Sequence, residues 1–162
     1  MREAKVKKRP DGLDSPVVAK LIKRGSRANV WVYRRTRGRI GGKWRVGSAL
    51  FHPVPVLLLN HRGRRSGRVY TSPLLYLRDG PHLVIVASQG GLPRNPQWYA
   101  NLAAHPDTTV QIRGEVHRVR ARTATPDERD ELWPRLVEVY ADFENYQRWT
   151  ERQIPVVILQ PR

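Results

Sequence analysis

The segment from Arg62 to Arg68 (RGRRSGR) combines anion-binding side chains with two glycines that allow the backbone to turn tightly. Arg64, Arg65 and the Ser66 hydroxyl are the hydrogen-bond donors that a phosphate or carboxylate needs. The segment is not a Walker loop, because the glycine spacing and the Lys-Ser/Thr pair of that motif are missing. A solvated hairpin turn has a similar composition, but the position between two apolar segments favours an anion-binding turn.

A second group of candidate residues is aromatic. Tyr140, Phe143 and Tyr146 are three residues apart, and Trp149 continues the series, so one helix face would carry all four rings. Such stripes usually belong to a hydrophobic core. Tyrosine hydroxyls can also donate a hydrogen bond or a proton to a substrate, so Tyr140 and Tyr146 are candidate proton donors.

Two further segments are typical of ligand contacts. Residues 88–91 (SQGG) follow an apolar strand, where backbone N–H groups become free for a ligand. Pro73 interrupts another predicted strand, which predicts a sheet edge or a bulge with unpaired backbone near Ser72. The helix expected after residue 95 carries residues that pack on the sheet and one polar exception: Trp98, Tyr99, Leu102 and Asn101.

The residue types that are missing exclude several chemistries. With no cysteine, the chain has no disulfide, thiolate metal site, iron–sulfur cluster or cysteine nucleophile. Its five histidines show no spacing that predicts a metal site, and no GxSxG motif predicts a serine nucleophile. We therefore expect no metal and no acid–base or nucleophilic machinery beyond the tyrosines. A protein that binds and orients a cofactor has these features.

The charge of the chain is distributed unevenly. A length of 162 residues predicts one domain, with a formal charge of +16. Residues 1–70 hold 19 Lys and Arg against 3 Asp and Glu, so the whole excess lies in this half. The asymmetry predicts an anionic partner, which can be nucleic acid, a lipid surface or an acidic small molecule.

The N-terminal residues divide into two segments before the main domain. Residues 1–14 form a basic tail that we expect to be disordered. Residues 15–47 combine a basic amphipathic helix, which starts at Ser15-Pro16 and extends to Arg35, with a glycine-rich loop. No stretch has the roughly 20 apolar residues of a membrane span, and no apolar signal segment follows the basic N-terminus, so we expect a cytoplasmic protein.

Residues 48–162 form the expected main domain. Strands are predicted over 54–60, 69–77, 82–88, 108–113, 115–123 and 155–159, and helices over 95–104, 125–140 and 142–150. Thr125 and Glu128 have the spacing of a capping box. Because helices and strands do not alternate regularly, we expect an α+β fold with a mostly antiparallel sheet or barrel and added helices.

The order and spacing of these motifs resemble the deazaflavin-dependent nitroreductase family, whose members bind coenzyme F420 on an FMN-binding-like split β-barrel. The resemblance covers about residues 15–162 and rests on 57–80 (LLLNHRGRRSGRVYTSPLLYLRDG), 86–91 (VASQGG), 95–106 (NPQWYANLAAHP) and 137–159 (VEVYADFENYQRWTERQIPVVIL). It implies a split barrel over 48–162. It also implies an F420H2-dependent oxidoreductase that transfers a hydride from the reduced deazaflavin to a quinone or nitro-type acceptor.

The resemblance assigns roles to four segments and an aromatic cluster. Tyr140 and Tyr146 become the candidate catalytic residues, and Phe143 closes over the deazaflavin ring. The remaining cofactor-binding residues are Arg64, Arg65, Ser66, Tyr70, Thr71, Ser72, Pro73, Leu74, Leu75, Val86, Ala87, Ser88, Gln89, Gln97, Trp98, Tyr99, Ala100 and Asn101.

Three positions depart from the family pattern. Family members often have Arg where Tyr70 stands, Lys where Gln89 stands and Tyr where Phe143 stands. Arg68 is a candidate replacement for one of the two missing cations. Proton donation would then come from Tyr140, Tyr146 or solvent, and a quinone is the preferred acceptor.

Partners and alternatives follow from the charge. The helix over 16–35 would place the enzyme peripherally on the anionic inner face of the plasma membrane, where quinones dissolve. One alternative function is an FMN-binding or other ligand-binding split barrel. A nucleic-acid-binding module ranks last, because no helix-turn-helix, RRM or KH pattern is present. A homodimer is one expected assembly, and an N-terminal half folded over its own barrel is the other.

Overall fold

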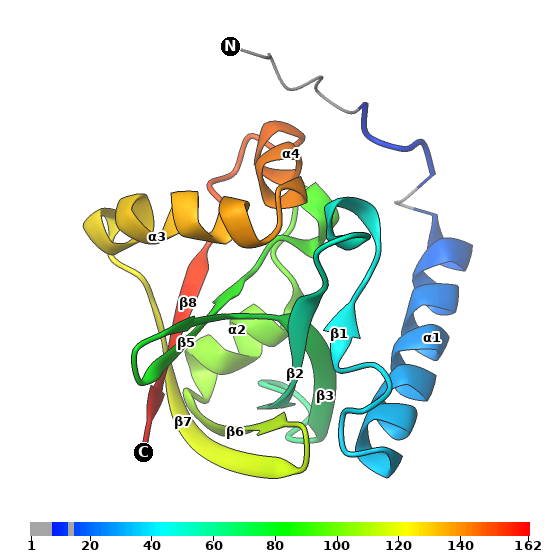
Figure 1. Cartoon of the computed structure of the whole chain (residues 1–162), viewed down its shortest axis with the longest axis vertical. Coiled ribbons are helices and arrows are strands. Elements are labelled where there is room, and N and C mark those ends of the chain that lie inside the picture. Colours follow the sequence, from blue (N-terminus) through cyan, green and yellow to red (C-terminus); the bar gives the residue numbers. More distant parts are fainter. Residues whose placement is uncertain (1–7, 13–14) are drawn as a thin grey trace.

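A computed structural model describes residues 8–12 and 15–162, so most of the predicted basic tail lies outside the described residues (Figure 1). The helices are α1 (Pro16–Arg35), α2 (Gln97–Ala104), α3 (Pro126–Val139) and α4 (Asp142–Arg148), with 3₁₀ turns η1 (Gly47–Ala49) and η2 (Gln89–Gly91). The strands are β1 (Lys43–Trp44), β2 (Val54–Arg62), β3 (Val69–Leu75), β4 (Leu77–Asp79), β5 (His82–Val86), β6 (Asp107–Ile112), β7 (Glu115–Thr123) and β8 (Val156–Pro161).

The strands form one curled antiparallel sheet with the order β1-β2-β6-β7-β8-β5-β4. Within the described chain, β3 pairs with β2 and with no other strand, so it is an edge strand. This confirms the position predicted from Pro73, whose missing N–H would break a second ladder. The predicted strand over 69–77 ends at Leu75, and β4 begins after Tyr76. The α+β fold expected from the sequence is confirmed.

Alternating side chains of the central strands enter separate cores. Leu83 and Ile85 of β5 face the inside of the curled sheet, where Trp98 of α2 covers them. Val84 and Val86 of the same strand point the other way, toward α3 and α4. Strand β8 repeats this pattern, so these two strands separate two apolar cores.

Helix α1 packs on the outer face of β2 through a third core. Val30 and Tyr33 of the helix contact Val56 and Leu58. The buried Tyr33 hydroxyl donates to the carbonyl of Val56 at 3.0 Å and accepts from the N–H of Arg113 at 2.8 Å. The C-terminal half of α1 is therefore fixed to the sheet, and the helix runs alongside β3 (Figure 1).

The predicted capping box is present at the start of α3. The N–H of Glu128 donates to Thr125 Oγ1 at 3.3 Å, and the N–H of Thr125 donates to Glu128 Oε2 at 2.8 Å. Arg122 also binds the Glu128 carboxylate with two hydrogen bonds of 2.7 Å, which lowers the pKa of Glu128 to about 2. Helix α3 is thereby attached to the C-terminal end of β7.

Candidate functional site

A groove lies between α1 and the sheet and consists of two adjoining cavities of about 550 and 770 Å³. The two cavities share the lining residues Ile22, Ser26 and Ser72, so they form one continuous space. Ile22 and Ser26 come from α1, and Ser72 comes from the edge strand β3. The edge strand β3 therefore lies along the groove, where the sequence predicts ligand contacts.

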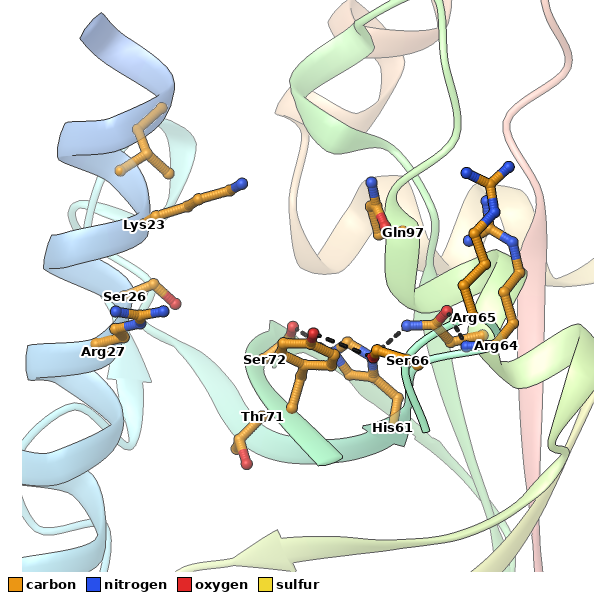
Figure 2. A pocket seen from close by; sticks show the side chains of 14 residues that line it. Lys23, Ser26, Arg27, His61, Arg64, Arg65, Ser66, Thr71, Ser72 and Gln97 are labelled. Carbon is orange, nitrogen blue, oxygen red and sulfur yellow. Dashed lines mark hydrogen bonds between the residues drawn. The ribbon is translucent and has the colours of Figure 1, made fainter. Parts of the chain in front are cut away.

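The smaller cavity is cationic. Lys23 and Arg27 extend from α1 on one side, and Arg64 and Arg65 extend from the turn between β2 and β3 on the other (Figure 2). None of the described residues that line this cavity is acidic, so its electrostatic potential favours an anion. The Ser66 hydroxyl lines the same cavity.

The turn that carries these arginines is tightly built. The N–H of Gly67 donates to the carbonyl of Gly63 at 2.8 Å, and the N–H of Gly63 donates to the carbonyl of Arg68 at 2.7 Å. A Cβ at Gly63 would lie 2.5 Å from Ser66 Oγ, and Gly67 has a φ of +69°. Glycine at position 67 is favoured by its left-handed backbone, whereas a side chain at position 63 would displace the Ser66 hydroxyl from its present position.

A buried hydrogen-bond network supports the boundary between the two cavities. His61, which is 5% exposed, lies between Ser72 and Asn101. Its Nε2 is 3.0 Å from Ser72 Oγ (Figure 2). Its Nδ1 is 3.0 Å from Asn101 Nδ2. Burial lowers the pKa of His61 to about 4, so the ring is neutral at pH 7.

The larger cavity is mainly apolar and aromatic. Its walls include Leu74 and Leu75 of β3, Trp98 of α2 and Phe143 of α4. The Tyr140 and Tyr146 hydroxyls lie 3.2 Å apart at the same cavity. Burial raises the pKa of Tyr140 and of Tyr146 above the ordinary tyrosine value, so both remain protonated at neutral pH. Each hydroxyl therefore keeps a proton that can be used in a hydrogen bond within the cavity.

The aromatic cluster is attached to the loop between α1 and β2. Asp142 Oδ2 accepts from the N–H of Ser48 at 2.8 Å, and Ser48 Oγ accepts from the N–H of Asp142 at 3.2 Å. Trp44 from the same loop hydrogen-bonds to Tyr140 and lines the aromatic cavity. The loop is therefore part of the wall over the tyrosines.

The turn after β5 forms another wall. Its backbone is left-handed at Gln89, Gly90 and Gly91, with φ values of 45°, 62° and 76°. Arg152 supports this turn by donating to the carbonyls of Ser88 at 2.8 Å and of Ala87 at 3.2 Å. A residue from the C-terminal part of the chain thus determines the shape of the cavity wall.

Most residues assigned to the site from the sequence lie around the groove. The cationic cavity is lined by Arg64, Arg65, Ser66, Tyr70, Thr71, Ser72, Gln97 and Asn101. The aromatic cavity is lined by Ser72, Pro73, Leu74, Leu75, Val86, Ser88, Gln89, Trp98, Tyr140, Phe143 and Tyr146.

Three of the assigned residues lie elsewhere. Ala87 is fully buried in the inner core. Tyr99 packs against that core, and its hydroxyl lies 2.9 Å from Thr123 Oγ1 of β7. Ala100 lines neither cavity. Gln97 and Asn101, four residues apart, present the side of α2 that faces the cationic cavity, whereas residues 99 and 100 lie outside that stripe.

Sequence reasoning missed the contribution of α1. Ile22, Ser26 and Asn29 line the groove at the i, i+4 and i+7 positions of one helix face. This spacing is visible in the sequence, but the basic residues between these three positions favour the interpretation of a helix that faces lipid. His61 was also missed, because nothing in its local sequence places it beside Asn101, 40 residues away.

A third cavity of about 720 Å³ adjoins the aromatic one and shares Gly41, Lys43, Arg45 and Val56 with it. Arg37, Arg39 and Arg113 add further positive charge, and no acidic side chain is among the described residues of its lining. The groove therefore has cationic surfaces on both sides of its aromatic middle.

Comparison with known proteins identifies the family. A family model described as F420H(2)-dependent quinone reductase matches residues 25–161. The chain belongs to this family. Rv3178 of Mycobacterium tuberculosis, whose name refers to the same family, is 52% identical over 118 residues, which cover 73% of this chain and 99% of that protein. The F420H(2)-dependent quinone reductase Rv1261c of the same species is 41% identical over 134 residues, which cover 81% of this chain and 86% of that protein.

Two solved structures are similar to this member of the F420H(2)-dependent quinone reductase family. The F420-H2 dependent reductase FDR-A has a TM-score of 0.61 and 36% identity, covering 65% of this chain and 94% of that chain. A structure described as a domain-swapped dimer has a TM-score of 0.62 and 27% identity, covering 88% and 99%. The predicted split-barrel fold is therefore confirmed.

The turn after β5 provides a test of how the aromatic wall is held. At Gly91, a Cβ would lie 2.8 Å from the carbonyl oxygen of Tyr146, whereas Gly90 has open space and a similar φ. We expect Gly90→Ala to cost about 1 kcal/mol of unfolding free energy through its left-handed backbone. Gly91→Ala should cost about 3 kcal/mol, because it also displaces α4.

Urea unfolding measures both costs. A Cβ at Gly91 would also lie 3.3 Å from Trp149 Cβ, so only Gly91→Ala should change the contribution of this tryptophan to the native-state fluorescence. Equal destabilisation by the two substitutions would show that α4 does not depend on the close approach of Gly91.

Proposed function

We propose that this chain reduces a quinone-class acceptor with F420H2, and that the reaction takes place in the groove between α1 and the sheet. One observation carries the proposal: a single groove joins a cationic cavity to an aromatic cavity with two protonated tyrosines. Membership of the F420H(2)-dependent quinone reductase family supports both the cofactor and the acceptor class.

The chemistry of the groove fits this cofactor. Coenzyme F420 has a flat deazaflavin ring and a phosphodiester that leads to a glutamate tail, so it needs an apolar surface next to cations. Arg64, Arg65 and Ser66 would hold the phosphate, with Lys23 and Arg27 close to the tail carboxylates. The ring would lie in the aromatic cavity, against the edge strand β3 and under Phe143 of α4.

The chain itself contributes alignment, exclusion of water and a proton. When bound, F420H2 supplies the hydride that the acceptor takes up. The walls of the aromatic cavity would hold the deazaflavin ring and the acceptor in contact, and this orientation would lower the barrier to hydride transfer. Tyr140 and Tyr146 hold protons at their hydroxyl oxygens. Because these oxygens are 3.2 Å apart, one hydroxyl can donate a hydrogen bond to the other while the second donates a proton to the acceptor.

Cofactor titration tests the cationic cavity. We expect the wild-type protein to bind F420 and the double variant Arg64→Gln/Arg65→Gln to bind it at least tenfold more weakly, because charge-assisted hydrogen bonds contribute about 1.5–3 kcal/mol each. The matched control is Arg78→Gln/Arg118→Gln, which removes the same charge from exposed positions outside the groove. Fluorescence titration at low and physiological salt measures both.

The same titration with FMN separates the two cofactor classes. Tight binding of FMN and none of F420 would support a flavin-binding split barrel instead. A wild-type protein that binds neither would contradict the proposal. Equal loss of F420 affinity in both double variants would show only general attraction by positive charge.

Substitution of the tyrosines tests proton donation. We expect Tyr140→Phe/Tyr146→Phe to lower the kcat of F420H2-dependent quinone reduction about 100-fold, with little change in cofactor affinity, because the variant keeps both rings and loses both donors. Tyr99→Phe is the control, since that hydroxyl bonds to Thr123 outside the groove. An unchanged kcat in the double variant would assign the proton to solvent.

We also propose that the chain contacts an anionic membrane surface peripherally. The proposal divides the chain into three parts: a tail (residues 1–14), a membrane-facing segment (residues 15–47) and the barrel (residues 48–162). Among the described residues, none of the helices has the length and apolar character needed to span a membrane. Peripheral contact depends instead on exposed apolar side chains that are interleaved with cations.

Two exposed surfaces support this contact. On α1, Val17, Leu21 and Trp31 are 66%, 63% and 67% exposed and share one face at i, i+4 and i+14. The loop between α1 and β2 also exposes large apolar residues: Ile40, Trp44, Val46, Leu50 and Phe51. Trp44 and Val46 line the aromatic cavity as well, so a loop in contact with lipid would lie where a quinone enters.

Vesicle co-sedimentation tests the membrane contact. We expect binding to vesicles that contain anionic phospholipid, none to neutral vesicles, and release at high salt, because each basic residue near the surface contributes about 1 kcal/mol. Leu21→Ser/Trp31→Ser should weaken binding, and Val69→Ser/Val116→Ser, which removes equally exposed apolar side chains outside both surfaces, should not. If the stripe on α1 instead covers a second copy, the first variant will convert a dimer into a monomer in light scattering, with no lipid binding by either form.

A further inference from the structure

We propose that His61 and Asn101 form a hydrogen-bond relay that holds the Ser72 hydroxyl as a donor to the ligand in the groove. His61 is then a positioning residue for this site, acting through Ser72. The proposal deepens the proposed function and rests on it for the identity of the ligand. The direction of every hydrogen bond in the relay follows from one backbone N–H group.

The fixed end of the relay is the turn that carries Arg64. The backbone N–H of Arg64 can only donate, and its nitrogen lies 3.1 Å from Asn101 Oδ1. This contact determines the orientation of the Asn101 amide, whose oxygen must face Arg64. The amide nitrogen, Nδ2, therefore faces His61 Nδ1 at 3.0 Å and donates to it.

The orientation of Asn101 determines the tautomer of His61. Because Nδ1 accepts a hydrogen bond, it carries no proton, and the single proton of the neutral imidazole must be on Nε2. The neutral state agrees with the burial of the ring, which is 5% exposed and stacks on Tyr70 at a centroid distance of 5.8 Å. Nε2–H then donates to Ser72 Oγ at 3.0 Å.

The tautomer of His61 in turn directs the hydroxyl of Ser72. Because Ser72 Oγ accepts from His61, its own proton is available for another acceptor. Ser72 lines both cavities of the groove and belongs to the edge strand β3. If the phosphate occupies the cationic cavity and the ring occupies the aromatic one, the chain that joins them passes Ser72. The hydroxyl would donate to an oxygen of that connecting chain.

The relay also connects the site to the anion-binding turn. Arg64 contributes its side chain to the cationic cavity and its backbone N–H to Asn101. A tautomer with the proton on Nδ1 would place two N–H groups against each other at His61 and Asn101. The folded position of the turn thus imposes one donor direction on a hydroxyl that lies on a different strand.

The tautomer can be measured in the unliganded protein. In ¹⁵N NMR spectra of protein labelled at histidine, we expect the His61 Nε2 signal in the range of a protonated ring nitrogen and the Nδ1 signal in that of an unprotonated one. His82, which is partly exposed on β5, provides an internal comparison. A proton on Nδ1 of His61 would overturn the relay, whatever the protein binds.

Binding of F420 by variants tests whether the relay reaches the ligand. We expect Ser72→Ala to weaken binding about tenfold, as loss of one hydrogen bond would. His61→Phe keeps a ring but no donor and should weaken binding by a similar factor. His61→Gln can place an N–H near Nε2 and an oxygen near Nδ1, so it should restore affinity to within about threefold of wild type.

A double-variant cycle separates relay from scaffold. If His61 acts through Ser72, His61→Phe/Ser72→Ala will bind F420 about as weakly as Ser72→Ala, because the second change removes nothing further. Losses that multiply to about 100-fold, or an equal loss in His61→Gln and His61→Phe, would show a structural role and overturn the proposal. A wild-type protein that binds no F420 would contradict the proposed function, and the relay would then be judged on the NMR result.

Discussion

The Tyr33 hydroxyl attaches α1 to the sheet, and the groove depends on this attachment. By bonding to Val56 and Arg113, it joins the helix to β2 and to the turn after β6. Near Tyr33 the helix packs in an apolar core with Val30. One to three turns earlier, the residues that face the sheet are Asn29, Ser26 and Ile22, and they line cavities instead of closing a core. A helix fixed at one end and separated from the sheet at the other leaves an elongated space beside the edge strand β3.

The chemistry of this space changes along its length because different elements contribute each wall. The turn after β2 and the basic face of α1 make one end cationic, whereas α2, α4 and β3 make the middle aromatic. Several positive charges with no acidic partner in the lining repel one another, and a bound anion relieves that repulsion. The aromatic part needs no charged group, since the phenols of Tyr140 and Tyr146 remain protonated at neutral pH. This division suits a ligand with an anionic tail and a flat apolar ring.

Much of the fold and of the site could be predicted from local sequence patterns. Pro73 predicted an edge strand because it lacks an N–H, and β3 is one. Thr125 and Glu128 predicted a helix start because their side chains reach only adjacent backbone groups, and the capping box is present. The anion-binding turn over 62–68 was recognisable because glycines and arginines act within a few residues of each other. Tyr99 lies elsewhere because α2 turns its side chain toward Thr123, which no local pattern indicates.

The sequence by itself determined which segments form strands and helices, where positive charge accumulates and which motifs place the chain in its family, because these properties depend on neighbouring residues. Only the tertiary structure decided that α1 is a wall of the groove, that Arg152 supports the turn at Ser88, and that His61 lies between Asn101 and Ser72. These contacts join residues 11 to 64 positions apart. The curl of the sheet brings such pairs together. The directions of their hydrogen bonds are set by backbone groups, such as the N–H of Arg64, whose positions depend on the folded chain.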